Sequence, residues 1–159
     1  MSKDVLLRPA VEADAPGIAA LLHYYAVDGI LLDRNEEDIL FYLHNFTVAV
    51  DENDNILGCM AVRDFGNDLL EVRSLAIQPG LRRGGIGRKL LEKAISRLDE
   101  ERGNYRLFAL TLQPGFFEHL KFSVVDKELF PEKIWADCSR CPKRDCCDET
   151  AVIYNGRSS

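Results

Sequence analysis

Residues 71–89 read EVRSLAIQPGLRRGGIGRK and carry the clearest structural signal in the chain. An alternating strand pattern up to Ile77 leads into a glycine-rich turn, and an amphipathic helix follows directly. Glycines let the main chain approach a ligand closely, and a helix start adds unpaired N–H groups and the positive end of a dipole. The order of strand, glycine turn and helix therefore predicts a cradle for an anion such as a pyrophosphate.

The charge around this turn favours a ligand with several phosphates. Between Arg82 and Arg97 the chain carries six basic residues against one acidic residue, although the whole protein has a net charge of −6. Neither a Walker-type Gly-Lys-Ser/Thr sequence nor a dinucleotide-binding glycine spacing is present. The acidic balance speaks against nucleic-acid binding, because affinity for phosphate backbones depends on clustered Lys and Arg. We expect a small-molecule partner.

The composition fits one ordinary globular domain. A chain of 159 residues, 47% of them hydrophobic, can bury a substantial core. No apolar run approaches the roughly 18 residues of a membrane span, and no signal-peptide core follows Met1. We expect a single domain over residues 1–159. We also expect the protein to be cytoplasmic, to have no membrane partner and to be a monomer or homodimer.

Hydrophobic periodicity predicts alternating helices and strands before the central stretch. Asp14 begins a helix with Pro16 in its first turn, and Gly29 ends it. Asn35 caps a second helix that continues to about His44. The expected elements are a strand at 5–7, helices at 14–28 and 35–44, and strands at 46–50, 56–65 and 69–77.

The pattern continues after the glycine turn. The cradle helix stops at Gly103, and the strand that follows is expected to lie parallel to 69–77, because it comes after a strand and a helix. We expect Gly156 to Ser159 to fray. The remaining elements are a strand at 107–112, a short helix at 114–120, a strand at 122–125, a helical turn at 131–136 and a closing strand at 150–154.

The central strand carries charged residues at alternate positions. Side chains alternate between the two faces of a strand, so every second residue is predicted to share one face. A carboxylate and a guanidinium would then point the same way. The residues of this face are Leu69, Glu71, Arg73, Leu75 and Ile77.

With these features the sequence resembles the GNAT family of acetyl-CoA-dependent N-acetyltransferases. The family motif Arg/Gln-x-x-Gly-x-Gly/Ala is matched by Arg82, Gly85 and Gly87, and the resemblance covers nearly the whole chain. It implies an α/β (α+β) fold with a mixed, mostly antiparallel sheet of six to seven strands and about four helices. It also implies a V-shaped cleft after the strand at 69–77.

The resemblance assigns the donor site to the central stretch. The pantetheine arm of acetyl-CoA would pair with the main chain near Leu75, Ala76 and Ile77. The pyrophosphate would lie on the amides between Arg83 and Arg88. The cofactor-binding residues implied at the turn are Arg82, Arg83, Gly84, Gly85, Ile86, Gly87 and Arg88.

The reaction of such enzymes is direct attack of a neutral amine on the acetyl thioester in a ternary complex, which requires a base. Family members often carry a glutamate on the central strand, so Glu71 is the candidate base. Many also have a tyrosine as general acid after the phenylalanine of the late helix, where this chain has Phe117. Lys121 likewise replaces the usual glycine before Phe122.

Within the family, the chain is most similar to amino-acid N-acetyltransferases, the N-acetylglutamate synthases of arginine biosynthesis. The shared stretches are 29–34, 72–76 and Leu110-Thr111. Glutamate is a dicarboxylate, so Arg34 and Arg73 are the candidate substrate-binding residues. Acetylation of a protein α-amine or another amine is the alternative, and a catalytically silent acetyl-CoA-binding module is a third possibility. We expect no amino-acid kinase domain before Met1 and hence no feedback through one.

Four of the five cysteines are crowded into a loop at about 137–148. Their thiolates could hold a structural zinc, form a disulfide or stay free, and the sequence leaves these alternatives open. A nucleophilic role is not expected, because direct transfer needs no cysteine. The four residues are Cys138, Cys141, Cys146 and Cys147.

Overall fold

The computed structural model describes residues 5–31, 33–81, 84–126 and 150–156. The described residues up to Arg63, together with 72–97, form one compact unit, called the first unit here. Residues 64–71 and the described residues from Leu98 onward form the second unit. That one domain spans residues 1–159 stays a prediction. The helical turn at 131–136 and the cysteine loop lie outside the described residues.

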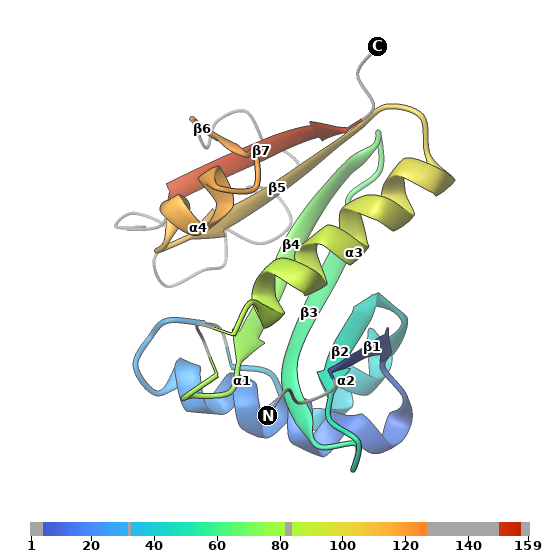
Figure 1. Cartoon of the computed structure of the whole chain (residues 1–159), viewed down its shortest axis with the longest axis vertical. Coiled ribbons are helices and arrows are strands. Elements are labelled where there is room, and N and C mark those ends of the chain that lie inside the picture. Colours follow the sequence, from blue (N-terminus) through green and yellow to red (C-terminus); the bar gives the residue numbers. More distant parts are fainter. Residues whose placement is uncertain (1–4, 32, 82–83, 127–149, 157–159) are drawn as a thin grey trace. The chain divides into compact units, whose positions relative to one another are not determined.

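The described elements follow the predicted order (Figure 1). Two short 3-10 turns, at Glu12–Asp14 and Leu43–Asn45, accompany them. In chain order the elements are β1 (Leu6–Pro9), α1 (Ala15–Ala26), α2 (Glu36–Phe41), β2 (Phe46–Val50), β3 (Ile56–Asp64), β4 (Leu69–Ile77), α3 (Ile86–Glu101), β5 (Tyr105–Thr111), α4 (Pro114–Glu118), β6 (Ser123–Val125) and β7 (Thr150–Gly156).

The strands form a seven-stranded sheet in the order β1-β2-β3-β4-β5-β7-β6. The pairs β1/β2, β2/β3, β5/β7 and β6/β7 are antiparallel, whereas β4 and β5 are parallel. The parallel pair follows from the helix that connects its strands, as the sequence predicted. The mixed, mostly antiparallel sheet with helices α1 to α4 confirms the predicted fold class within the described residues.

Helix α1 begins and ends close to the positions that its sequence predicts. A proline occupies the first turn, and the helix is followed by Gly29 with φ +71°. The Gly29 N–H donates to the carbonyl of Ala26 at 3.0 Å, and the Ile30 N–H donates to that of Tyr25 at 3.1 Å. These bonds satisfy carbonyls at the helix end, so α1 stops two residues before the predicted Asp28.

The second helix is shorter than predicted. Asn35 caps it as expected, because its side chain accepts the N–H of Asp38 at 2.8 Å. However, α2 ends at Phe41 instead of His44, because Tyr42 leaves the helical region with φ −106° and ψ 22°. A separate 3-10 turn then leads into β2. The helical periodicity of the sequence did not reveal this break.

The predicted alternation along β4 does not extend through its whole length. Ser74 has φ 53°, which is left-handed backbone inside a strand. Alternation assumes extended backbone at each step, so it can be counted from Leu69 to Arg73 but not through Ser74. The prediction that Leu75 and Ile77 lie on the same face as Glu71 assumed extended backbone along the whole strand, and Ser74 breaks that assumption.

Each unit has its own apolar core. In the first unit α1, α2, β2 and β3 pack their buried side chains together. In the second unit residues of β4, β5 and β7 do the same. The first core includes Ile18, Leu22, Ile39, Phe46 and Val48, and the second consists of Leu69, Phe108, Ala151 and Ile153.

The end of β7 differs from the prediction. Gly156 pairs with Tyr105 inside the sheet instead of fraying. A Cβ at Gly156 would lie 1.9 Å from the ring of Tyr105, so the ring occupies the space that a side chain would need. The missing side chain is what allows this strand pair to close.

Candidate active site

Arg34 is the centre of a polar cluster in the first unit. Its Nε donates to Oδ2 of Asp38 at 2.5 Å, and its Nη1 donates to the hydroxyl of Ser74 at 3.4 Å. The two contacts join the loop after α1 to the first turn of α2 and to β4. Arg34 is a predicted substrate-binding residue, and the structure brings it to the strand that carries Arg73.

Aromatic rings support the same guanidinium. The Cζ atom of Arg34 lies 5.0 Å from the ring centroid of Phe46 and 5.6 Å from that of Tyr42. Both distances fit cation–π contact, which strengthens where water is partly excluded. Only 15% of the Arg34 side chain is exposed. The guanidinium therefore has aromatic contacts in addition to its hydrogen bonds.

Ser74 is the residue of β4 that contacts Arg34. Its carbonyl accepts a hydrogen bond from Sγ of Cys59 at 3.4 Å, while its hydroxyl meets Arg34. Burial raises the pKa of the Cys59 thiol to about 12, although a hydrogen bond from the Ala76 N–H works against the increase. Cys59 is thus a neutral donor that helps to fix the left-handed residue. Left-handed backbone at a non-glycine residue costs on the order of 1 kcal/mol.

The predicted donor residues of β4 lie at the end of the strand. Leu75 and Ile77 are half-buried, whereas Ala76 is buried. The carbonyl of Ile77 accepts the hydroxyl of Tyr25 at 2.5 Å, and the N–H of Gln78 donates to Leu57 on β3 at 2.9 Å. Helix α1 and strand β3 therefore anchor the strand end that is predicted to pair with the pantetheine arm.

The glycine turn has the conformation that its sequence predicts. Gly85 has φ +79°, which favours glycine, and α3 begins at the next residue. The N–H of Gly84 donates to the Leu81 carbonyl at 3.0 Å and closes the turn. Ile86 and Gly87 are buried, and exposed Arg88 pairs with Glu92 at 3.1 Å. Arg82 and Arg83 lie outside the described residues.

Because the first N–H groups of any helix have no partner inside it, the start of α3 offers donors to an anion. The two described residues directly before it, Gly84 and Gly85, carry no side chain that could block an approach to these amides. A Cβ at Gly85 would meet no atom within 4 Å. The described part of the turn fits the pyrophosphate of acetyl-CoA.

Two further predicted residues belong to the second unit. Glu71 on β4 is only 4% exposed, so it is a buried carboxylate. Phe117 is buried too, and its ring meets Phe116 and Phe122 edge-on at centroid distances of 5.1 and 5.2 Å. The ring at the usual tyrosine position therefore serves the core of this unit.

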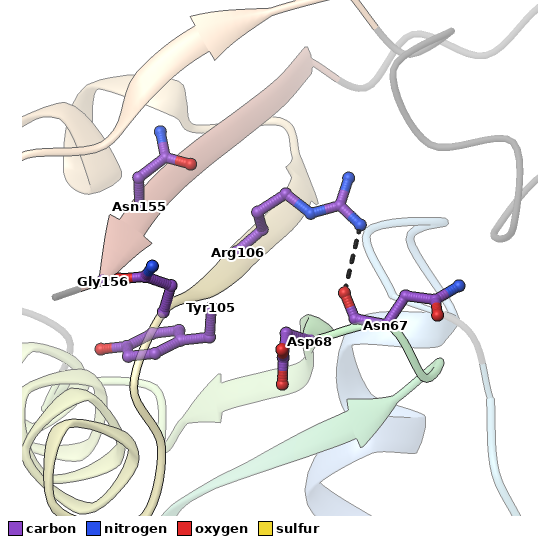
Figure 2. Close-up of a pocket in the computed structure, with 7 residues that line it drawn as sticks. Asn67, Asp68, Tyr105, Arg106, Asn155 and Gly156 are labelled. Atoms are coloured by element: carbon purple, nitrogen blue, oxygen red, sulfur yellow. Dashed lines mark hydrogen bonds between the residues drawn. The ribbon is translucent and has the colours of Figure 1, made fainter. Parts of the chain in front are cut away.

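A polar pocket of the second unit is separate from these residues. Figure 2 shows the guanidinium of Arg106 directed toward the main-chain oxygen of Asn67, with a hydrogen bond of 3.5 Å. No sequence-predicted site residue lines this pocket, so it is not the candidate active site. Its lining residues are Asn67, Asp68, Asn104, Tyr105, Arg106, Asn155 and Gly156.

No group of three or more His, Cys, Asp or Glu side chains among the described residues is arranged to hold a metal. The four clustered cysteines lie outside that part of the chain, so a zinc site there stays a prediction. The same described residues include no helix that is long and apolar enough to cross a membrane.

Sequence reasoning found Arg34 but missed the residues that hold it. Asp38 stands four positions after Arg34, but Arg34 precedes the predicted helix at 35–44, so the helical ion-pair spacing did not point to this contact. Ser74 gave no signal either, because its contact with Arg34 spans forty positions and depends on a left-handed strand residue.

The comparisons with known proteins agree with this fold. The sequence pattern of the acetyltransferase (GNAT) family matches residues 18–122. An uncharacterized N-acetyltransferase of Chlorobaculum tepidum is 43% identical over 150 residues, covering 94% of this chain and 96% of that protein. An amino-acid acetyltransferase of Neisseria meningitidis is 34% identical over 132 residues, covering 80% of this chain but 29% of that protein. The chain thus spans less than a third of that relative.

Among solved structures, the N-acetylglutamate synthase from Neisseria gonorrhoeae, complexed with coenzyme A and N-acetyl-glutamate, is similar with a TM-score of 0.81. The sequence identity is 26%, and the match covers 98% of this chain and 36% of that one. The family pattern, the relatives and the glycine turn at the start of α3 agree. This chain belongs to the GNAT family of acetyl-CoA-dependent N-acetyltransferases.

Proposed function

We propose that the protein acetylates the amine of an amino acid, with L-glutamate as the first candidate. The observation that carries this proposal is the guanidinium of Arg34, held by Asp38, Ser74 and two aromatic rings in a partly buried site. A fixed guanidinium is the preferred protein partner of a carboxylate. Relatives named amino-acid acetyltransferase support the same substrate class. The product would serve arginine biosynthesis.

The proposed reaction needs no covalent enzyme intermediate. The neutral amine attacks the thioester carbonyl and forms the C–N bond, the C–S bond breaks, and CoA leaves as the thiol after gaining a proton. Glu71 is the proposed base for the amine proton, and Arg73 is the proposed partner of a second carboxylate. With Phe117 at the usual tyrosine position, the proton of the thiol comes from another group or from solvent.

One observation favours a second candidate, a silent acetyl-CoA-binding module. Phe117 lies buried between two other phenylalanine rings and carries no proton that it could give to the thiolate. Such a module would bind acetyl-CoA without turnover. Acetylation of a protein α-amine is the remaining enzymatic alternative, because the family fold also serves such acceptors.

A panel assay separates these functions. The protein is incubated with acetyl-CoA and L-glutamate, other amino acids, polyamines or peptides, and the released CoA thiol is titrated. Turnover with free amino acids is the expected result. Turnover with peptides alone would contradict the glutamate assignment, and acetyl-CoA binding without any turnover would establish the silent module.

A further inference from the structure

The three nitrogen atoms of the Arg34 guanidinium differ in their hydrogen-bond partners. Oδ2 of Asp38 accepts a hydrogen bond from Nε at 2.5 Å, and the Ser74 hydroxyl lies 3.4 Å from Nη1. Nη2 has no hydrogen-bond partner among the described residues. No side-chain nitrogen or oxygen in that part of the chain is both buried and without a partner, so Nη2 keeps some contact with solvent. The edge formed by Nη1 and Nη2 is therefore the side that a ligand can reach.

Asp38 is itself fixed in place. It stands in the first turn of α2, and its N–H donates to the side-chain oxygen of the cap residue Asn35 at 2.8 Å. Its side chain is 41% exposed, whereas the Arg34 side chain is 15% exposed. The acidic partner thus belongs to a capped helix start, and the basic partner belongs to the loop before it. The helix holds the direction of the guanidinium.

We propose that Asp38 is a positioning residue for the acceptor carboxylate. By accepting the hydrogen bond of Nε–H, it turns the Nη1–Nη2 edge outward. That edge is then available for a bidentate pair of hydrogen bonds with one carboxylate of the acceptor. The inference rests on the proposed function, in which Arg34 holds that carboxylate. It adds a specificity residue that touches neither the acetyl group nor the acceptor.

Positioning and charge predict opposite effects of removing Asp38. A carboxylate beside an anion site repels the incoming acceptor, so loss of its charge alone would strengthen acceptor binding. Loss of the Nε contact lets the guanidinium rotate, so loss of positioning would weaken acceptor binding. The direction of the change in KM therefore identifies which role Asp38 has.

The test compares Asp38→Ala and Asp38→Asn in the full chain with L-glutamate and acetyl-CoA. Asp38→Ala is expected to raise the KM for L-glutamate about tenfold, the loss of about one hydrogen bond to a charged group. The KM for acetyl-CoA and kcat are expected to stay within about twofold. Asp38→Asn keeps an oxygen that can accept from Nε, so we expect it to restore most of the affinity.

Asp33→Asn is the matched control. It removes the same charge one residue before Arg34, where Asp33 is exposed and paired with His23 at 3.1 Å. We expect it to leave the KM for L-glutamate unchanged. The melting temperatures of all variants are measured, so that unfolding is not mistaken for lost positioning.

An unchanged or lower KM in Asp38→Ala overturns the inference, and so does a KM in Asp38→Asn as high as that in Asp38→Ala. These outcomes differ from failure of the proposed function, which appears already in the wild type as no turnover with any free amino acid. That result would overturn both proposals together. An NMR readout is independent of turnover: the Nε–H signal of Arg34 should exchange slowly in the wild type and in Asp38→Asn, but fast in Asp38→Ala.

Discussion

Gly58 on β3 faces Ile77 on β4 with no room for a side chain between them. A Cβ at Gly58 would lie 2.8 Å from Cδ1 of Ile77, 3.1 Å from Cγ2 of Ile86 and 3.2 Å from the carbonyl oxygen of Ala76. Ile77 ends the strand that precedes the glycine turn, and Ile86 begins the helix that follows it. One glycine therefore sets how closely both sides of the donor turn approach β3.

Gly58→Ala tests this packing. The methyl group has to displace a main-chain oxygen as well as two side chains, so we expect a loss of about 1–3 kcal/mol in the free energy of unfolding. The KM for acetyl-CoA should rise more than the KM for the acceptor. Chemical denaturation and steady-state kinetics measure the two effects. Gly103→Ala is the control, because a Cβ there meets nothing within 4 Å. Equal behaviour of the two variants would contradict the packing argument.

The ion pair of Asp14 with Arg8 should make the free energy of unfolding depend on pH in the acid range. Asp14 accepts Nη1 of Arg8 at 2.7 Å and the N–H of Val11 at 2.8 Å. Burial alone would raise the pKa of Asp14, but these bonds outweigh it, so the pKa is lower than in the unfolded chain. The stabilisation is present at neutral pH and is lost as pH falls through the lowered pKa.

We therefore expect Asp14→Asn to lower the free energy of unfolding by about 2 kcal/mol at pH 7. Below pH 4 the difference from the wild type should shrink. Urea denaturation at several pH values measures this. If Arg8→Met costs the same in the wild type as in Asp14→Asn, the two residues are not coupled.

Lys121 occupies a position that suits glycine. Its φ is 74°, and the N–H of Phe122 donates across it to the carbonyl of Phe117 at 3.1 Å. Relief of the left-handed strain should let Lys121→Gly raise the free energy of unfolding by roughly 0.5–1 kcal/mol. Lys121→Ala keeps the strain and should bring no such gain. Thermal unfolding compares the variants, and a gain in both would show that the backbone is not the cause.

Glu71→Gln tests the proposed base. The amide keeps the size of this buried side chain but cannot accept the amine proton, so kcat should fall at least about 100-fold. The acid limb of the pH–rate profile should disappear with the carboxylate. Glu118→Gln makes the same change at an exposed residue of α4 and should leave both unchanged. An intact pH–rate profile in Glu71→Gln would remove this residue from the mechanism.

Local signals in the sequence predicted most of the fold. The bounds of β2 and β4 agree with the alternating patterns, and Asn35 and Gly29 mark helix ends through their own hydrogen bonds and dihedral angles. The parallel pairing of β5 followed from connectivity. These features depend on residues close to one another in the chain, and this is why sequence alone was sufficient.

The rest depended on contacts between distant residues. Ser74 is left-handed within a strand pattern that looks regular, and its neighbours Cys59 and Arg34 come from other elements. Gly156 belongs to β7 because the ring of Tyr105 covers it. No local pattern reports such pairs. The sequence therefore identified Arg34 as a candidate without showing what orients it.

The proposed carboxylate site at Arg34 is tested most directly by combining Arg34→Ala with acceptors that lack one carboxylate. Acetyl transfer is measured by CoA release with L-glutamate, with glutamine, which lacks the side-chain carboxylate, and with isoglutamine, which lacks the α-carboxylate. We predict that Arg34→Ala raises the KM for L-glutamate about 10- to 100-fold, as loss of a charge-assisted pair would. For one of the two amides, the same substitution should change little. Equal losses with all three acceptors, or none, would contradict a carboxylate site at Arg34.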